Sequence, residues 1–262
     1  MTKNILVNIS DGIATVTLNR PEKRNAVDYA GWLELKRIAE ELERDGDVRV
    51  VVITGARDRA FSAGADIADF EEYRSDGAKA RVYAAAFEGA MDAIEAISKP
   101  TICLIKGFCV GGGCEMSMAA DLRFAADNAR FGIPVAHLGI LIGYAEMSRL
   151  LRLVGPGNAA SILYTGRPFG SEDALRMGLV NEVHPLDQID DFVHELALSM
   201  VPLAPLSQAR HKRIMRTTLN NPGLTGLSEQ EQALPFTNFD SEDFHEGRTA
   251  FLEKRRPVFK GR

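Results

Sequence analysis

Two loops built from small residues, each placed after a short apolar strand, constrain this chain most strongly. The first loop covers residues 61–66 (FSAGAD) and follows an apolar run at 50–53. The second covers residues 111–115 (GGGCE) and follows the run at 101–105. Loops without bulky side chains can bring two backbone N–H groups to one point, where they can bind a developing oxyanion. Glu115 ends the second loop and is therefore placed to move protons beside that point.

The length and charge of the chain limit its class. With 262 residues, 45% of them hydrophobic, it can bury a substantial core as one large domain or as one domain with an appendage. Its net charge of -5 disfavours a general nucleic-acid-binding role. Basic residues gather at 20–24 and at 254–262, either as two solvated patches or as parts of one site for a multiply charged anion.

The cysteines and the first residues bear on location and on metal binding. Cys103, Cys109 and Cys114 are an odd set without paired spacing, which suits a reducing compartment. No nearby histidine completes a metal-ligand set, so we expect small buried residues and no metal site. The sequence opens without a signal or transit pattern, and no apolar run is long enough to span a bilayer. We therefore predict a cytoplasmic protein without a membrane partner.

The spacing of apolar residues predicts strands that alternate with helices. Residues 4–10 and 13–18 alternate around Asp11 and Gly12 as in a β-hairpin, and Asp28 is a candidate cap for a helix that ends at 45–46. Further expected elements are strands at 49–54, 101–106 and 122–126, and helices at 77–97, 112–120, 144–153, 157–165, 171–178, 186–200, 203–220 and 241–255. This order predicts an α/β fold of stacked ββα units with largely buried sheets.

No low-complexity linker divides the chain, so the domain organisation rests on the order of the elements. We predict a core of residues 1–195 and a helical extension of residues 196–262 that has little core of its own. Such an extension either packs on a neighbouring subunit or folds back over the mouth of an active site. The polar segment 70–77 is either a lid over that site or an ordinary solvated connection.

A series of motifs runs through nearly the whole chain in order. They are NRPEKRNA at 19–26, AFSAGADI at 60–67, GFCVGGGCE at 107–115, Asp121, FGIP at 131–134, LYTG at 163–166, GLVN at 178–181 and RPVFK at 256–260. This series closely resembles the crotonase (enoyl-CoA hydratase/isomerase) superfamily. The resemblance implies a crotonase-like spiral of ββα repeats with a C-terminal helical trimerisation region. It also implies an acyl-CoA substrate, no cofactor beyond that coenzyme A, and a homotrimer or a hexamer built from two trimers.

The resemblance implies catalytic roles for individual residues. Ala63 and Gly112 match the positions whose backbone N–H groups form the oxyanion hole for the thioester carbonyl. Two fixed donors stabilise the enolate oxygen more than they stabilise the ground state. Glu115 matches the first catalytic glutamate of the family's hydratases, and apolar neighbours should raise the pKa of its carboxyl. The competing interpretation is a structural ion pair between Glu115 and Arg123.

The resemblance also implies residues that bind coenzyme A. Ala65, Asp66 and Ile67 match the stretch that lines the adenine site of the family. Arg24 and Lys260 match basic positions near the nucleotide phosphates, the second of them often contributed across a subunit interface.

One position departs from the pattern of the hydratases. Those enzymes typically read Phe-Gly-x-Pro-Glu, but here Val135 stands at the place of the second glutamate and cannot transfer a proton. Other members place an aspartate eight residues further on, where this chain has Gly143. Either Glu115 acts alone, or a nearby group replaces the missing carboxyl. The candidates are Glu146, which we favour, and then Tyr144 and His137.

The sequence thus predicts an enoyl-CoA hydratase/isomerase-like enzyme that acts on an acyl-CoA thioester through an enolate. Because of Val135, other reactions of the superfamily stay open as alternatives, namely decarboxylation, thioester hydrolysis or carbon–carbon cleavage. A CoA-ester-binding protein without catalysis is a further alternative.

Overall fold

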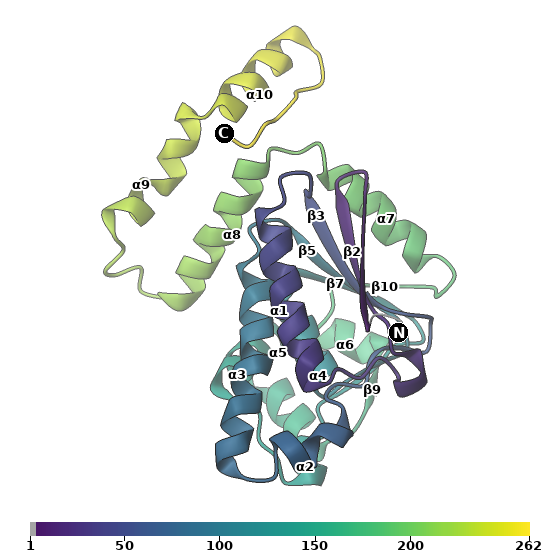
Figure 1. The fold of residues 1–262 in the computed structure, drawn as a ribbon. Coiled ribbons are helices and arrows are strands. Elements are labelled where there is room, and N and C mark those ends of the chain that lie inside the picture. Colours follow the sequence, from purple (N-terminus) through teal and green to yellow (C-terminus); the bar gives the residue numbers. More distant parts are fainter. Residues whose placement is uncertain (1–3) are drawn as a thin grey trace.

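A six-stranded sheet runs through the centre of the molecule (Figure 1). The structure, a computed structural model, describes residues 4–262. The strands, in spatial order, are β1 (Ile5–Ser10), β2 (Ile13–Leu18), β3 (Val50–Gly55), β5 (Thr101–Ile105), β7 (Leu122–Ala126) and β10 (Glu182–His184). β1 and β2 are antiparallel, and every other neighbouring pair is parallel. Parallel neighbours require crossover connections, which the helices and a second sheet supply.

The sheet is buried on both faces along β3, β5 and β7, whose successive side chains point to opposite faces, whereas β1 at its edge is mostly exposed. On β3, Val51 and Ile53 join the core beneath α1 (Tyr29–Arg44) and α3 (Gly77–Ala96). Val50 and Val52 join a second cluster under α7 (Ile189–Met200). A strand covered on both faces reads as a continuous apolar run, which is the pattern of residues 50–53.

A smaller sheet supplies the second strand of each repeating unit. It contains β4 (Ala60–Ser62), β6 (Phe108–Val110), β8 (Arg130–Gly132) and β9 (Phe169–Gly170), in that spatial order. Each of β3, β5 and β7 is followed by one strand of the smaller sheet and then by helical structure. Those helices are α2 (Phe70–Tyr73) with α3, then α4 (Gly112–Ser117), and then α5 (Tyr144–Thr165). The predicted ββα repeats are therefore confirmed.

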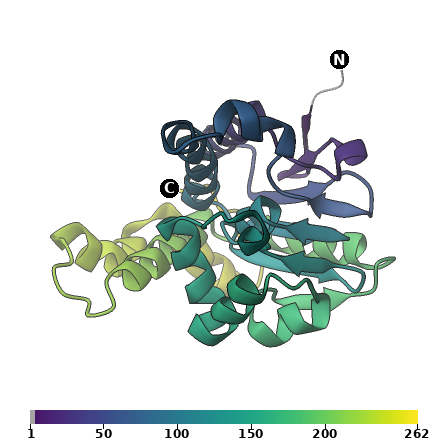
Figure 2. The ribbon, with the colours of Figure 1, turned by 90° about the horizontal axis from the view of Figure 1, so that it is seen from below.

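The remaining helices extend the chain beyond the repeats. They are α6 (Ser171–Met177), α8 (Pro205–Asn220), α9 (Glu229–Thr237) and α10 (Glu242–Glu253), with short 3-10 turns at Pro21–Lys23, Ile67–Asp69, Val135–Leu138 and Asn238–Asp240. The last three long helices project to one side of the sheet (Figure 2). Lys212 on α8 is buried and bonds the carboxylate of Asp121 at 2.7 Å, which ties this projection to the core.

Residues 201–262 follow α7 and form the C-terminal arm. The predicted boundary between residues 195 and 196 falls inside that helix, whose Ile189, Val193 and Ala197 pack on the central sheet. The division into a core and an extension stays a prediction. None of the helices in residues 4–262 combines the length and the apolar character needed to cross a bilayer.

Most predicted elements agree with the structure, and the differences are short segments. The helices predicted at 144–153 and 157–165 are one element with a kink at Gly155, which has non-helical backbone angles before Pro156. The sequence did not predict the four short strands of the smaller sheet (β4, β6, β8 and β9), nor β10, α2 or α9. β10 has three residues and pairs with β7 at the edge of the sheet, so its partner, not its own pattern, makes it a strand.

Candidate functional site

A large cavity opens between the two small-residue loops, α3 and the start of α5. Its volume is about 910 Å³. One side of the cavity is lined by residues of the two loops and by Glu115, namely Ala63, Ala65, Gly111, Gly112 and Glu115. The opposite wall is largely apolar and includes Phe70, Tyr83, Phe87, Val135, Leu138, Ile140 and Ile142. The cavity thus brings the two loops of the sequence together with an apolar chamber.

The two loops approach each other so closely that only glycine fits at their contact. A Cβ added to Gly64 would lie 2.7 Å from the nitrogen of Gly112 and 2.7 Å from the carbonyl oxygen of Val110. Gly64 also has a φ of 90°, a conformation that other residues rarely adopt. These neighbours are backbone atoms and cannot rotate away, so the glycine at position 64 sets the spacing of the loops.

The structure changes one of the two predicted oxyanion donors. The amide of Ala63 donates to the carbonyl of Arg24 at 2.9 Å, so it is already used within the chain. The prediction that Ala63 supplies a free N–H group is therefore wrong. Its neighbour Gly64 donates to the Ser62 hydroxyl at 3.1 Å.

Ala65 is the residue of this loop whose amide is free. Val27 forms a parallel bridge with Ala65 by bonding the carbonyl of Gly64 and the amide of Asp66, so the N–H of Ala65 faces the other way. It has no acceptor in residues 4–262. A Cβ added to Gly112 would lie 3.4 Å from this nitrogen, so the two amides lie side by side. The amide of Gly112 is the first of α4 and has no acceptor within that helix.

Hydrogen bonds to the Asn25 side chain hold the loop that carries Ala65. The buried Asn25 side chain donates to the carbonyls of Ala56 and Ala60 at 3.1 and 2.7 Å and accepts from the Arg20 amide. The Ser62 hydroxyl donates to the carbonyl of Asn25 at 2.8 Å. The first loop is thereby fixed to the N-terminal segment and to the end of β3.

Glu115 lies in the first turns of α4, inside the cavity and almost fully buried. Burial raises the pKa of its carboxyl to about 8, the nearby carboxyl of Glu146 adds to this rise, and the guanidinium of Arg74 opposes it. Arg123 instead donates to the carbonyls of Leu179, Ala120 and Ser117. The ion pair between Glu115 and Arg123 considered above is therefore absent from the described chain.

Of the three candidates for a second proton group, Glu146 is the one that lines the cavity in the described chain. It is 3% exposed, and neither of its carboxylate oxygens has a hydrogen-bond partner in residues 4–262. Tyr144 is 97% exposed and lies outside the lining. His137 is exposed and lies against Gly166, away from the cavity. Val135 is part of the wall, as a residue without a titratable group.

The predicted adenine-site residues Ala65, Asp66 and Ile67 all line the mouth of the cavity. Asp66 accepts from Lys23 at 2.7 Å and from Arg20 at 2.8 Å. Burial alone would raise the pKa of Asp66, but bonds from Lys23, the Ala68 amide and Arg20 lower it to about 2. The carboxylate of Asp66 thus organises the loop.

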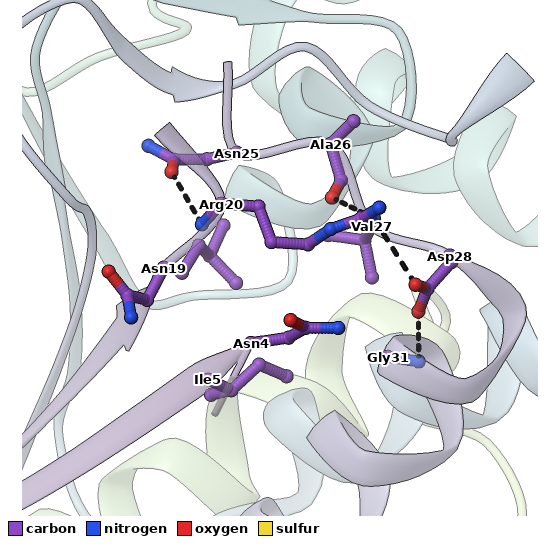
Figure 3. Close-up of a pocket in the computed structure, with 10 residues that line it drawn as sticks. Asn4, Ile5, Asn19, Arg20, Asn25, Ala26, Val27, Asp28 and Gly31 are labelled. Carbon is purple, nitrogen blue, oxygen red and sulfur yellow. Dashed lines mark hydrogen bonds and ion pairs between the residues drawn. The ribbon is translucent and has the colours of Figure 1, made fainter. Parts of the chain in front are cut away.

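Arg20, which bonds Asp66, also contacts residues just before α1, and Figure 3 shows these contacts. Its guanidinium bonds the carbonyl of Ala26 at 3.0 Å and pairs with Asp28 at 3.2 Å. Beside it lies a cavity of about 10 Å³, lined also by Asn4 and Val27, with room for about one water molecule. This small cavity is part of the structural support and has no space for a substrate.

The two predicted phosphate-site cations lie apart in the single chain. Arg24 has left-handed backbone angles, and its guanidinium lies 5.1 Å from the centre of the Phe108 ring. Lys260 lies on the C-terminal arm, where its amide bonds the carboxylate of Asp243 at 2.7 Å. Neither side chain lines the large cavity, whereas Lys23 does.

Two charged residues of the cavity were not singled out from the sequence. Arg74, in the segment 70–77, lies 4.7 Å from the Phe70 ring centre and 4.9 Å from that of Tyr83. Glu88 lies on α3 and faces the same cavity. Both stand in segments that look like ordinary polar helix or loop, so no sequence pattern distinguishes them. The segment 70–77 covers part of the cavity, and its motion as a lid stays a prediction.

The three cysteines are free and buried, and burial raises the pKa of Cys103 to about 12. No group of histidine, cysteine, aspartate or glutamate residues in the described chain could hold a metal ion.

Comparison with known proteins identifies the family. The sequence matches the enoyl-CoA hydratase/isomerase family over residues 8–262. A short-chain-enoyl-CoA hydratase of Clostridium acetobutylicum is 34% identical, over 97% of this chain and 96% of the relative. A crotonyl-CoA hydratase of Syntrophomonas wolfei is 38% identical, over 98% of each.

A solved structure agrees with the fold. The crystal structure of an enoyl-CoA hydratase/carnithine racemase from Magnetospirillum magneticum has a TM-score of 0.95 at 34% identity, over 100% of this chain and 97% of that one. The predicted superfamily and its α/β fold are confirmed. This chain belongs to the enoyl-CoA hydratase/isomerase family.

Proposed function

We propose that this enzyme binds a 2-enoyl-CoA thioester and adds water across its double bond or moves that bond, through an enolate. The observation that carries the proposal is one cavity that holds two free amides and a buried carboxyl with a pKa of about 8. A proton-transfer group works best when its pKa lies near the working pH. Relatives of 34 and 38% identity are named enoyl-CoA hydratases, which supports the same reaction.

The carbonyl oxygen of the thioester accepts hydrogen bonds from the amides of Ala65 and Gly112 in this proposal. As the enolate forms, negative charge grows on that oxygen, and both donors are already oriented toward it. The dipole of α4, which begins at Gly112, adds to the same field. Losing one such donor raises a reaction barrier by about 3 kcal/mol.

Glu115 transfers the proton at the α or β carbon. In hydration, the hydroxyl of one water molecule adds to the β carbon and one proton adds to the α carbon. The reaction therefore needs two proton transfers, one from the attacking water and one to the α carbon. Either Glu115 performs both proton transfers, or Glu146 performs one of them. Glu146 is the remaining candidate because it is buried in the cavity wall without a partner in the described chain.

The coenzyme A part of the substrate lies at the mouth, along Ala65, Asp66 and Ile67, and no further cofactor is proposed. Lys23 is a phosphate contact in addition to the predicted Arg24, since it lines the cavity beside Asp66. Lys260 reaches a nucleotide only from another copy of the chain. The three free thiols support a reducing compartment, and the cytoplasm is our proposed location.

A substrate panel tests the reaction. Crotonyl-CoA should lose its enoyl absorbance in the presence of the enzyme and gain a hydroxyl, as followed by mass spectrometry. Malonyl-type, β-keto and saturated acyl-CoA esters should be turned over much more slowly. Faster decarboxylation, cleavage or thioester hydrolysis would replace the proposal with one of these reactions. Tight binding without any turnover would leave a CoA-ester-binding protein.

We also propose that the C-terminal arm packs against other copies, in a homotrimer or a hexamer of two trimers. Several large apolar side chains of the arm are exposed in the single chain, namely Phe236, Phe239, Phe251 and Leu252. Exposed apolar groups of this kind are typical of protein interfaces. Analytical ultracentrifugation should give three or six chain masses for the wild type and smaller species for Phe251→Glu. A wild type that sediments as a monomer contradicts the proposal.

A further inference from the structure

One wall of the cavity contains two carboxyl groups that converge on one point. A Cβ added to Gly143 would lie 2.4 Å from Oε2 of Glu146 and 3.0 Å from Oε1 of Glu88. Both oxygens therefore lie within 3.0 Å of a single position beside the Cα of Gly143. The absence of a side chain at Gly143 leaves the space that these carboxyl groups occupy. This also explains why an aspartate at position 143 is incompatible with Glu146 in its present place.

The described chain supplies no hydrogen-bond donor to the buried carboxyl of Glu146. Both oxygens of Glu146 are buried without a hydrogen-bond partner in the described chain, and Glu88 forms no ion pair there. Arg149 on α5 bonds Asp92 at 2.6 Å and Glu95 at 2.7 Å through its Nη2 and forms no bond to Glu146, although its Nη1 is also buried without a partner in the described chain. A buried acceptor without a donor is costly, and polar groups in proteins are rarely left in that state. Such groups at a cavity wall call for a donor from the ligand.

The charged groups around this pair of carboxyls shift the pKa values of Glu88 and Glu115. Burial raises the pKa of Glu88, the carboxyls of Glu146 and Asp92 add to the rise, and Arg149 opposes it. Glu115 is influenced by Glu146 and Arg74. Glu115, Glu146 and Glu88 all line the same cavity.

We propose that Glu88 and Glu146 form a subsite for a hydrogen-bond-donating substituent, a hydroxyl or an ammonium group, on the acyl chain of the substrate. The inference rests on the proposed function, because it takes the acyl chain to run from the amides of Ala65 and Gly112 past Glu115 to the wall that holds Glu88 and Glu146. Converging acceptors bind a donor group and exclude a carboxylate. A plain hydrocarbon end leaves the buried carboxyl of Glu146 without a partner.

Arg74 is the main alternative group in the cavity that could bind a polar substituent of the acyl chain. Its guanidinium lines the same cavity and forms no ion pair in residues 4–262, so a carboxylate on the acyl chain could bind there. The rings of Phe70 and Tyr83 already accept this cation on their faces, which satisfies part of its charge. The unpartnered Glu146 has no such compensation, so the structure favours a donor over an acid.

Four 2-enoyl-CoA esters of equal chain length test this, ending in methyl, hydroxyl, ammonium or carboxylate. The wild type should have a kcat/KM about 10- to 100-fold higher for the hydroxyl or ammonium ester than for the methyl ester, as expected for a buried acceptor that gains its donor. The better of the two donors identifies the substituent as neutral or cationic. Equal values for all four esters, or the highest value for the carboxylate ester, would overturn the proposal.

Variants separate recognition from catalysis. Glu88→Leu should raise kcat/KM for the methyl ester and lower it for the preferred donor ester, so that the ratio inverts. Glu195→Leu, at an exposed position on α7 outside the cavity, should leave the ratio as in the wild type. If no ester is turned over, unreactive thioether analogues with the same four ends measure the ratio of Kd values instead. A ratio of one refutes the subsite, whereas binding selectivity without turnover refutes only the proposed reaction.

Discussion

Glu115→Gln should lower kcat by about 10²- to 10⁴-fold, the range for losing a positioned proton-transfer group. Its side chain lines the reaction cavity, and burial raises the pKa of its carboxyl to about 8. Glutamine has the shape of the protonated glutamate, so the fold and the binding of a CoA ester should persist. Steady-state kinetics and calorimetric titration with a non-reacting ester measure the two effects separately. Glu195→Gln, on the exposed surface of α7, is the control and should retain wild-type kcat.

The same variant has a defined pH signature. In the wild type, Glu115 is protonated in the folded state below about pH 8 and in the unfolded chain only below its ordinary value of 4.5. Folding therefore takes up a proton between these values, and this contribution to stability is full below pH 4.5 and is lost as pH rises through 8. The free energy of unfolding of the wild type should fall across this window relative to that of Glu115→Gln. A difference that stays constant with pH would contradict the raised pKa, and a fully active variant would remove Glu115 from the mechanism.

Gly64→Ala should destabilise the protein by about 3 kcal/mol or more and abolish activity, because a strained backbone and an overpacked contact each cost about 1–3 kcal/mol. The new Cβ would lie 2.7 Å from the Gly112 nitrogen and 2.7 Å from the Val110 oxygen, in a backbone conformation with a φ of 90°. Relief requires the two loops to separate, which also separates the amides of Ala65 and Gly112. Denaturant unfolding and a turnover assay on the remaining folded protein measure the two losses.

A matched glycine provides the control for this substitution. Gly77 begins α3, and a Cβ added there meets no atom within 4 Å. Gly77→Ala should be neutral or slightly stabilising, because alanine is the better helix former. If Gly64→Ala behaves like Gly77→Ala, the close approach of the loops is not what holds the two amides together.

The sequence predicted the architecture well because apolar spacing and turn residues record it directly. The helix that Asp28 caps and the strand at 122–126 are two examples, since each has a local signal at its ends. α9 has a local signal at its start, a capping box of Ser228 and Glu231, which the sequence prediction above did not include. Its apolar pattern is weak, because Pro235 interrupts it and none of its residues is buried in the single chain.

The sequence predicted which loops form the site, but not which residue of the first loop supplies the free amide. Ala63 and Ala65 are alike in sequence, and the choice between their amides depends on the bridge with Val27, a residue far away in the chain. The grouping of Glu88 with Glu146 likewise arises from packing of α3 against α5 near Gly143. No sequence pattern indicates that two carboxyl groups on separate helices lie close together in the fold.

The two halves of the site have separate structural supports. The loop that presents Ala65 is anchored by Asn25 and Ser62 to the N-terminal segment and β3, whereas the acyl chamber is walled by α3, the turn at Val135–Leu138 and the start of α5. Substitutions in the chamber can therefore alter which acyl group is accepted without disturbing the amides that activate the thioester. Such a division makes this scaffold suited to evolving, or to being engineered toward, new substrates while its activating machinery stays constant.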